Sequence, residues 1–234
     1  MQRSIAFLSS GRSKDKCMRL VQYLCCLLHG LSSRTGWAKD VVMTKSRKLG
    51  MSLALMRKIV RLGVPVELFA AIYRRTKEGG LANSGWMRSL AQFFRIVYLL
   101  SDHFLLCFRL GVLQSRPSGW RLPLLKSFNK LVWLAEVLLT LVANAFDTQA
   151  LALEIQNMQD LNLDKKTPDD QAKYRLATQR FFLLQLDTVR AAGDLPVIMY
   201  FMQPSLFSGA FVGLMGTITS AIGCYQCWLL ANPS

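Results

Sequence analysis

The residue types that most often perform chemistry are sparse in this chain, and their spacing is not that of a catalytic or metal site. Cys224 and Cys227 form a C-x-x-C pair, but they lie in an uncharged apolar stretch, and no second Cys or His pair completes a zinc site. His29 and His103 are far apart in the sequence, without a Ser-His-Asp or Cys-His partner set. No phosphate-binding glycine motif is present. The sequence therefore predicts a protein that is not an enzyme and that holds no metal or cofactor.

The composition argues against a soluble domain. Apolar residues make up 52% of the 234 residues and charged residues only 18%, whereas about a quarter of residues are charged in typical soluble proteins. The charge is unevenly placed, because residues 1–90 hold 17 Lys and Arg against 4 Asp and Glu. A basic region attracts nucleic acid or anionic lipid. Since no zinc-finger, RNP or helix-turn-helix signature accompanies it, we expect an anionic phospholipid membrane as the partner, and no nucleic acid.

The last part of the chain predicts a membrane-spanning helix. No charged residue occurs from Leu195 to Ser234. Residues 205–230 contain neither proline nor charge, and at about 1.5 Å per residue they are long enough for a hydrocarbon core of roughly 30 Å. Tyr225 and Trp228, near the end of this run, suit an interface anchor.

Small residues recur at helical spacing along this run and form a flat face, on which another helix approaches closely in lipid. They are Gly209, Gly213, Gly216, Ser220 and Gly223. We expect this transmembrane packing face to contact another span or another copy of the chain.

A second apolar zone contains two further candidate spans, and the sequence leaves open which of them crosses the membrane. Residues 90–112 include Asp102, Arg95 and Arg109, and each ionisable group at mid-bilayer costs about 2.5–3.5 kcal/mol on insertion scales. Residues 131–146 hold a single glutamate and are the cheaper span on that basis. Asp102 lies seven residues from both arginines and therefore on the same helical face, so we expect it to pair with one of them.

The basic N-terminal region shows the periodicity of amphipathic helices. Residues 13–29 have apolar side chains on one face, with Arg12, Lys16 and Arg19 on the other. Residues 38–62 show the pattern most clearly. Their apolar face, the predicted membrane-insertion face, holds Val42, Leu49, Leu53, Met56 and Val60. Their basic face, the predicted anionic-lipid contact, holds Lys39, Arg47, Arg57, Lys58 and Arg61. Such a helix lies in a membrane surface, where each basic side chain contributes about 1 kcal/mol.

We therefore expect an all-α integral membrane protein with N-terminal amphipathic helices and two or three membrane-spanning helices. Before the C-terminal span, an amphipathic helix that begins at residue 171 should stop at the sequence from Gly193 to Pro196. The expected regions are a basic amphipathic part (1–85), apolar helices that include a span (86–156), an acidic loop (157–170), an amphipathic helix (171–196) and the C-terminal transmembrane helix (205–230).

Several short motifs occur along the chain in a characteristic order. They are D-K-x-x-R-x-x-Q-Y from Asp15, R-K-x-x-R-L-G from Arg57, Y-x-x-x-D from Tyr98, D-L-P from Asp194, and the small-residue pattern from Gly213 to Tyr225. Each motif alone is weak, but their order and spacing together resemble the peroxisomal biogenesis factor 11 family over most of the chain.

The resemblance implies a protein of the peroxisomal membrane. Because basic segments stay on the cytosolic side of a membrane, we expect the N-terminus in the cytosol. The compact chain and short acidic loop are similar to glycosomal members from kinetoplastid protists. Members of the family insert amphipathic helices into the cytosolic leaflet, elongate the membrane, self-associate and recruit the organelle division machinery; an import receptor for peroxisomal membrane proteins is another implied partner. A solute pore or metabolite channel is the alternative function, because ionisable residues within apolar segments can line a path.

Overall fold

The computed structural model describes residues 2–36, 40–77, 85–113, 121–160 and 168–231, and within these ranges it contains helices and no strand. In chain order they are α1 (Gln2–Ser9), α2 (Gly11–Thr35), α3 (Asp40–Val60), α4 (Val64–Lys77), α5 (Gly85–Arg109), α6 (Arg121–Asp160), α7 (Pro168–Met202) and α8 (Gly209–Leu230). Among the described residues, α5, α6 and α8 are long and apolar enough to cross a membrane. The all-helical membrane protein expected from the sequence is therefore confirmed. The sequence left open whether residues 90–112 or 131–146 cross the membrane, and both segments overlap candidate spans, α5 and α6.

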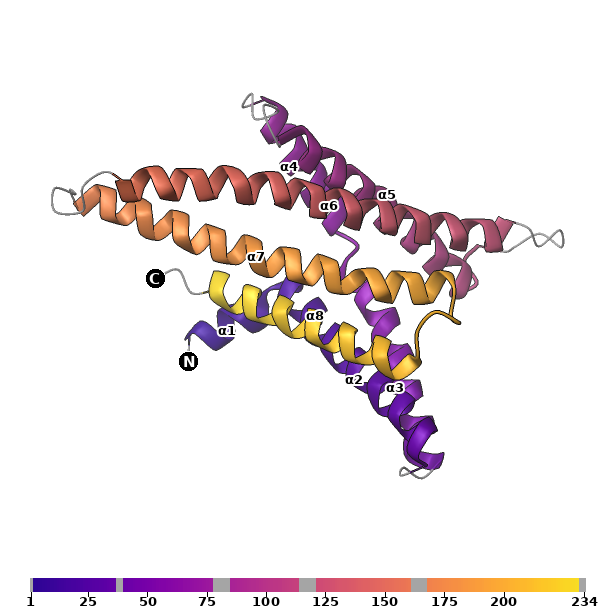
Figure 1. The fold of residues 1–234 in the computed structure, drawn as a ribbon. Helices are drawn as coiled ribbons and strands as arrows, with labels where there is room; N and C mark the ends of the chain where they lie inside the picture. Colours follow the sequence, from indigo (N-terminus) through magenta and orange to yellow (C-terminus); the bar gives the residue numbers. More distant parts are fainter. Residues whose placement is uncertain (1, 37–39, 78–84, 114–120, 161–167, 232–234) are drawn as a thin grey trace.

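The two longest helices, α6 and α7, run antiparallel and form the central pair of the molecule (Figure 1). Near the α6–α7 connection, Gln159 donates a hydrogen bond to the Tyr174 hydroxyl at 2.9 Å. Farther along, Val137 of α6 packs in one buried cluster with Ala191 and Ile198 of α7. Residues nearer the N-terminus of α6 therefore contact residues nearer the C-terminus of α7, as antiparallel packing along the pair requires.

Helix α7 continues through Pro196 to Met202, and the stop expected between Gly193 and Pro196 is wrong. A proline inside a helix removes one backbone hydrogen bond and usually kinks or ends it. Here the residues that follow it, Val197 and Ile198, are completely buried against neighbouring helices. Tertiary packing therefore maintains the helix where the local signal predicts its end.

Helix α8 packs against α7 on one side and α2 on the other (Figure 1). A Cβ added at Gly213 would lie 2.5 Å from the backbone nitrogen of Leu27, and one at Gly216 would overlap the Tyr23 ring. Only glycine permits so close an approach. At the far end of the pair, the Phe7 ring of α1 lies 5.6 Å from that of Trp228, centroid to centroid, so the first helix and the end of the last helix meet.

The remaining helices complete the arrangement. Helix α3 packs on α2, and α4 packs on α5, where Arg75 donates hydrogen bonds to Ser89 and Gln92 at 3.2 and 3.0 Å. Helix α5 packs on α6. The C-terminal end of α3 reaches back to α5 through Lys58 and Asp102. Six helices therefore contact one another in the closed order α5, α6, α7, α8, α2 and α3.

Candidate functional site

Many of the side chains buried inside the bundle are polar, and many of those exposed on its outside are apolar. Its buried polar side chains come from α2, α5, α6, α7 and α8, and include Asp15, Arg19, Asp102, Asn129, Asn144, Asp194, Thr219, Ser220 and Gln226. Large apolar side chains are exposed on the same helices, among them Val21, Leu24, Leu28, Leu100, Phe104, Leu131, Leu138, Val189 and Leu214. Charged side chains are almost never fully buried in soluble proteins unless they are paired. This reversed polarity suits a protein surrounded by lipid, where charges turn toward the bundle interior.

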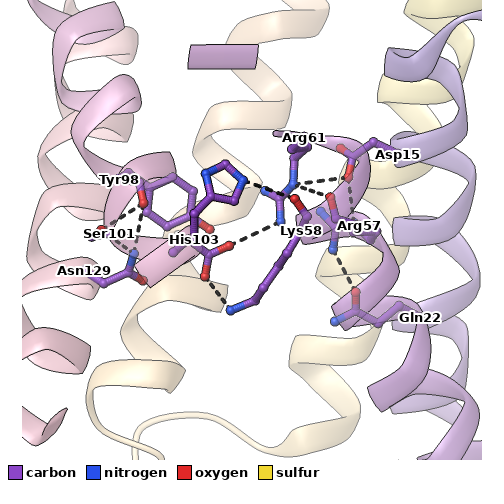
Figure 2. A network of polar contacts seen from close by, with 10 residues as sticks. Asp15, Gln22, Arg57, Lys58, Arg61, Tyr98, Ser101, His103 and Asn129 are labelled. Carbon is purple, nitrogen blue, oxygen red and sulfur yellow. Dashed lines mark hydrogen bonds and ion pairs between the residues drawn. The ribbon is translucent and has the colours of Figure 1, made fainter. Parts of the chain in front are cut away.

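Figure 2 shows the network that ties α3 to α2. Arg57 donates to the Asp15 carboxylate at 3.0 Å and to the Gln22 side-chain oxygen at 2.7 Å. Arg61, just after α3, lies 3.5 Å from the same carboxylate. Burial lowers the pKa of Arg57, and the negative charge of Asp15 offsets part of that effect, so the guanidinium stays charged at physiological pH. Two cations therefore converge on one buried carboxylate.

The same network continues from α3 to α5 and α6 (Figure 2). Lys58 donates to the Asp102 carboxylate at 2.6 Å, and Arg61 lies 3.5 Å from its second oxygen. Next to it, Ser101 accepts a hydrogen bond from Asn129 of α6 at 2.7 Å. Arg61 thus contacts carboxylates of both α2 and α5 and connects these two helices.

These contacts correct the partner expected for Asp102. Neither Arg95 nor Arg109 pairs with it. Its carboxylate is instead paired with Lys58 of α3 and with Arg61, just after that helix. Arg95 instead lies 3.8 Å from Glu136 of α6. Helical spacing identifies neighbours within one helix, but these partners come from other helices.

A second polar group, built around an ion pair, joins α2 to α7. Arg19 donates to the Asp194 carboxylate, and both side chains are almost completely buried. The same guanidinium lies 3.4 Å from the Thr219 hydroxyl of α8. Three helices therefore meet at one arginine, which the sequence pattern placed on the side of its helix opposite the apolar face.

A third polar group connects α5, α6, α7 and α8. Arg88 donates to Asn144 at 3.2 Å, and Asn144 in turn donates to Asp187 at 3.3 Å. Asp187 pairs with Arg190, which also donates to Gln226 at 3.3 Å. Every step of this chain crosses from one helix to the next or links successive turns, so the group fixes the relative positions of four helices.

The predicted anionic-lipid residues divide into two sets. Arg57, Lys58 and Arg61 are engaged by carboxylates inside the molecule, and the structure thus gives them a role in joining helices. Arg47 is exposed, and Lys39 lies outside the described residues. The sequence missed the inward direction of the three cations because periodicity separates two faces of a helix without telling which one contacts protein.

The predicted insertion face remains mostly open. Val42, Leu49, Met56 and Val60 are exposed on α3, whereas Leu53 is half-buried. Their contact with lipid stays a prediction.

The small-residue face of α8 is turned toward α2 of the same chain. Gly213, Gly216, Ser220 and Gly223 are buried, and a Cβ at Gly223 would lie 3.0 Å from the Lys16 side chain. Gly209 is exposed instead. The sequence predicted the close approach, but not the matching position on α2, Gly30, where a Cβ would overlap the backbone of Ala210.

Comparison with known proteins agrees with these observations. The family model described as Peroxisomal biogenesis factor 11 (PEX11) matches residues 1–228. The chain belongs to the peroxisomal biogenesis factor 11 family. No curated protein and no solved structure matches the chain. The peroxisomal biogenesis factor 11 family acts in peroxisome proliferation and biogenesis and is associated with the peroxisomal membrane.

Many of the residues that suggested the peroxisomal biogenesis factor 11 family from the sequence make contacts between helices of the bundle. The motif residues with interhelical contacts are Asp15, Arg19, Gln22, Tyr23, Arg57, Lys58, Arg61, Asp102, Asp194, Gly213 and Gly216. The family motifs thus describe a polar core and a close helix contact, which are features of architecture.

Proposed function

We propose that this protein remodels the peroxisomal membrane by inserting the apolar face of α3 into one leaflet, which elongates the organelle and promotes its proliferation and fission. The supporting observation is the exposure of Val42, Leu49, Met56 and Val60 on a helix that is fixed to the bundle on its other side. Apolar side chains inserted at the boundary of headgroups and acyl chains occupy area in that leaflet, and such binding is sensitive to curvature.

The fixation of α3 matters to this mechanism. Lys58 and Arg61 join the end of α3 to α5, a candidate span, and Arg57 joins it to α2. Because α3 is held in this way, its apolar face stays with the bilayer-embedded part of the molecule. Each copy of the protein then adds area to the leaflet without a separate binding equilibrium for α3.

Exposed basic residues support contact with anionic headgroups. Lys45, Arg47 and Lys48 are all exposed in the first half of α3. A lysine or arginine near an anionic surface contributes about 1 kcal/mol, so these three retain part of the electrostatic attraction proposed for the basic face.

Location and partners complete the proposal. We place a multi-pass protein in the membrane of peroxisomes of the glycosomal type, with the N-terminus in the cytosol, because basic segments stay on that side. The family resemblance supports three partners. They are another copy of the chain, the organelle division machinery, and the import receptor that delivers peroxisomal membrane proteins.

The test uses the full chain reconstituted into vesicles that contain phosphatidylserine. Electron microscopy should show elongated vesicles with the wild-type protein and rounder ones with Leu49→Glu/Met56→Glu, because both side chains are exposed and their replacement removes the apolar face without disturbing the core. Thr44→Glu/Ser52→Glu changes exposed polar positions of the same helix by the same charge and should elongate vesicles normally. Equal elongation by both variants would contradict insertion of this face.

A solute pore is the second candidate. The buried charges of α2, α5, α6 and α7 are the observation that favours it, since ionisable groups within membrane proteins often mark solute paths. They include Arg19, Asp102, Glu136 and Asp194. Release of a small trapped anion from vesicles separates the two functions. Leakage that persists in the α3 double variant would assign conduction to the core, independently of membrane shape.

A further inference from the structure

Helix α2 follows α8 in antiparallel register along most of its length. Toward the start of α8, Gly30 packs on Ala210 and Leu27 on Gly213. At the middle, Arg19 reaches Thr219. The remaining contacts of the pair are Tyr23 with Gly216, Lys16 with Gly223, and Cys17 with Cys224, whose sulfur atoms are 4.0 Å apart.

This register determines the depth of α2. Helix α8 has 22 residues, a length of about 33 Å, which matches a hydrocarbon core of roughly 30 Å. If α8 crosses the bilayer, a helix packed beside it from Lys16 to Gly30 must occupy the same depth. The hydropathy of α2 does not reveal this, since its charged residues keep it out of the candidate spans.

The charges of α2 at this depth face the protein. Asp15 and Arg19 are buried and paired with Arg57 and Asp194, and Lys16 lies against Gly223. Between Asp15 and Leu31, where every side chain is described, no charged residue is exposed; the exposed side chains are Val21, Leu24, Cys26, Leu28 and Leu31.

Exposed charge returns only at the ends of this segment. On one side, Arg12 and Lys14 are exposed, and they lie near the end of α8 that carries the aromatic anchor Trp228, since Phe7 contacts that ring. Toward the other end, Lys45, Arg47 and Lys48 are exposed in the neighbouring α3, beside the last turns of the segment, because Gly50 of α3 packs on Cys25. Basic residues at both ends of an apolar surface are the arrangement expected of a membrane-embedded helix.

We propose that residues 15–31 of α2 lie within the hydrocarbon core beside α8, and that their exposed apolar face contacts lipid acyl chains. The start of α2 and the end of α8 then reach the same membrane surface, and the end of α2 reaches the opposite one. Since it concerns the depth of α2, this inference goes beyond the proposed remodelling function.

Site-directed spin labelling of the full chain in lipid vesicles tests the proposal. In a chain whose native cysteines are alanine, labels are placed at Leu24→Cys and Leu28→Cys, with Ile218→Cys of α8 as the bilayer reference and Lys14→Cys as the surface reference. Molecular oxygen concentrates in the bilayer and a hydrophilic nickel chelate in water. We expect both α2 labels to match Ile218, with fast relaxation by oxygen and loss of relaxation by nickel.

Each other outcome overturns the proposal in a recognisable way. Relaxation by nickel equal to that at Lys14 would place α2 in water. Slow relaxation by both reagents would show that protein, such as a second copy, covers this face.

The register is checked separately in the chain with its native cysteines. A short thiol-specific cross-linker should join Cys17 to Cys224 in vesicles, and Cys17→Ser should abolish the product. Failure of this cross-link would contradict the register on which the depth of α2 depends. Because this test uses the native cysteines, it stands even if the cysteine-free chain misfolds.

Discussion

The ion pair between Arg19 and Asp194 offers the sharpest test of the polar core. Only 9% of the Arg19 side chain and 11% of the Asp194 side chain are exposed. The neighbouring Thr219 hydroxyl, at 3.4 Å from the guanidinium, is neutral and does not replace a counter-ion. Each charge is therefore compensated mainly by the other.

Asp194→Asn keeps the shape of the side chain and removes the negative charge. Breaking a buried pair by removing one partner costs about 3–5 kcal/mol, because the other charge stays buried without compensation. At about 1.4 kcal/mol for each factor of ten, this lowers the folding equilibrium constant roughly a hundredfold to a few thousandfold. By contrast, replacing both partners with apolar residues of similar volume is often neutral or stabilising by about 1–4 kcal/mol.

The assay is reversible unfolding of the full chain in bicelles, measured for wild type, Asp194→Asn and Arg19→Met/Asp194→Leu. Reactivity of the buried Cys25 thiol reports separation of α2 from the bundle. We expect the single variant to be strongly destabilised and the double variant to be at least as stable as the wild type. A single variant with wild-type stability, or a double variant as unstable as the single one, would refute a compensated pair in a dry core.

Two further substitutions test the helix contacts. Gly213→Ala should cost about 1–3 kcal/mol and reduce the Cys17–Cys224 cross-link, because the added methyl meets the α2 backbone; Gly209→Ala, where the nearest atom is 3.9 Å away, should change neither quantity. Arg57→Gln should lower the unfolding free energy by about 1–3 kcal/mol, since it leaves a buried carboxylate with a weaker partner. Arg47→Gln, at an exposed position, should leave the unfolding free energy unchanged. Equal stability of these two variants would contradict the pairing of Arg57 with Asp15 and favour contact of Arg57 with the membrane surface.

Some features of the fold follow directly from local sequence. The all-helical class and the C-terminal span are predicted by apolar runs long enough to cross a bilayer, and α8 covers residues 209–230 of the expected 205–230. The close-packing face of that span is also readable, because small residues at helical spacing permit approach by any helix. The helix that packs on this face, α2, is separated from α8 by most of the chain, so the spacing of small residues in α8 does not identify it.

Other features depended on contacts that no local pattern specifies. Pro196 marks a helix end by propensity, yet burial of Val197 and Ile198 carries α7 past it. Asp102 has arginines at helical spacing, but its partners are Lys58 of α3 and Arg61, just after that helix.

The sequence by itself determined that this is a basic, helical membrane protein, since composition, length and periodicity are properties of each segment alone. The tertiary structure decided which side of each amphipathic helix is inside. A helical pattern separates a polar face from an apolar one, but it does not say which face meets protein and which meets the surroundings. In α2 the paired charges of Asp15 and Arg19 face the core and Leu24 faces outward, because in lipid it is the charges that need partners and the apolar side chains that do not.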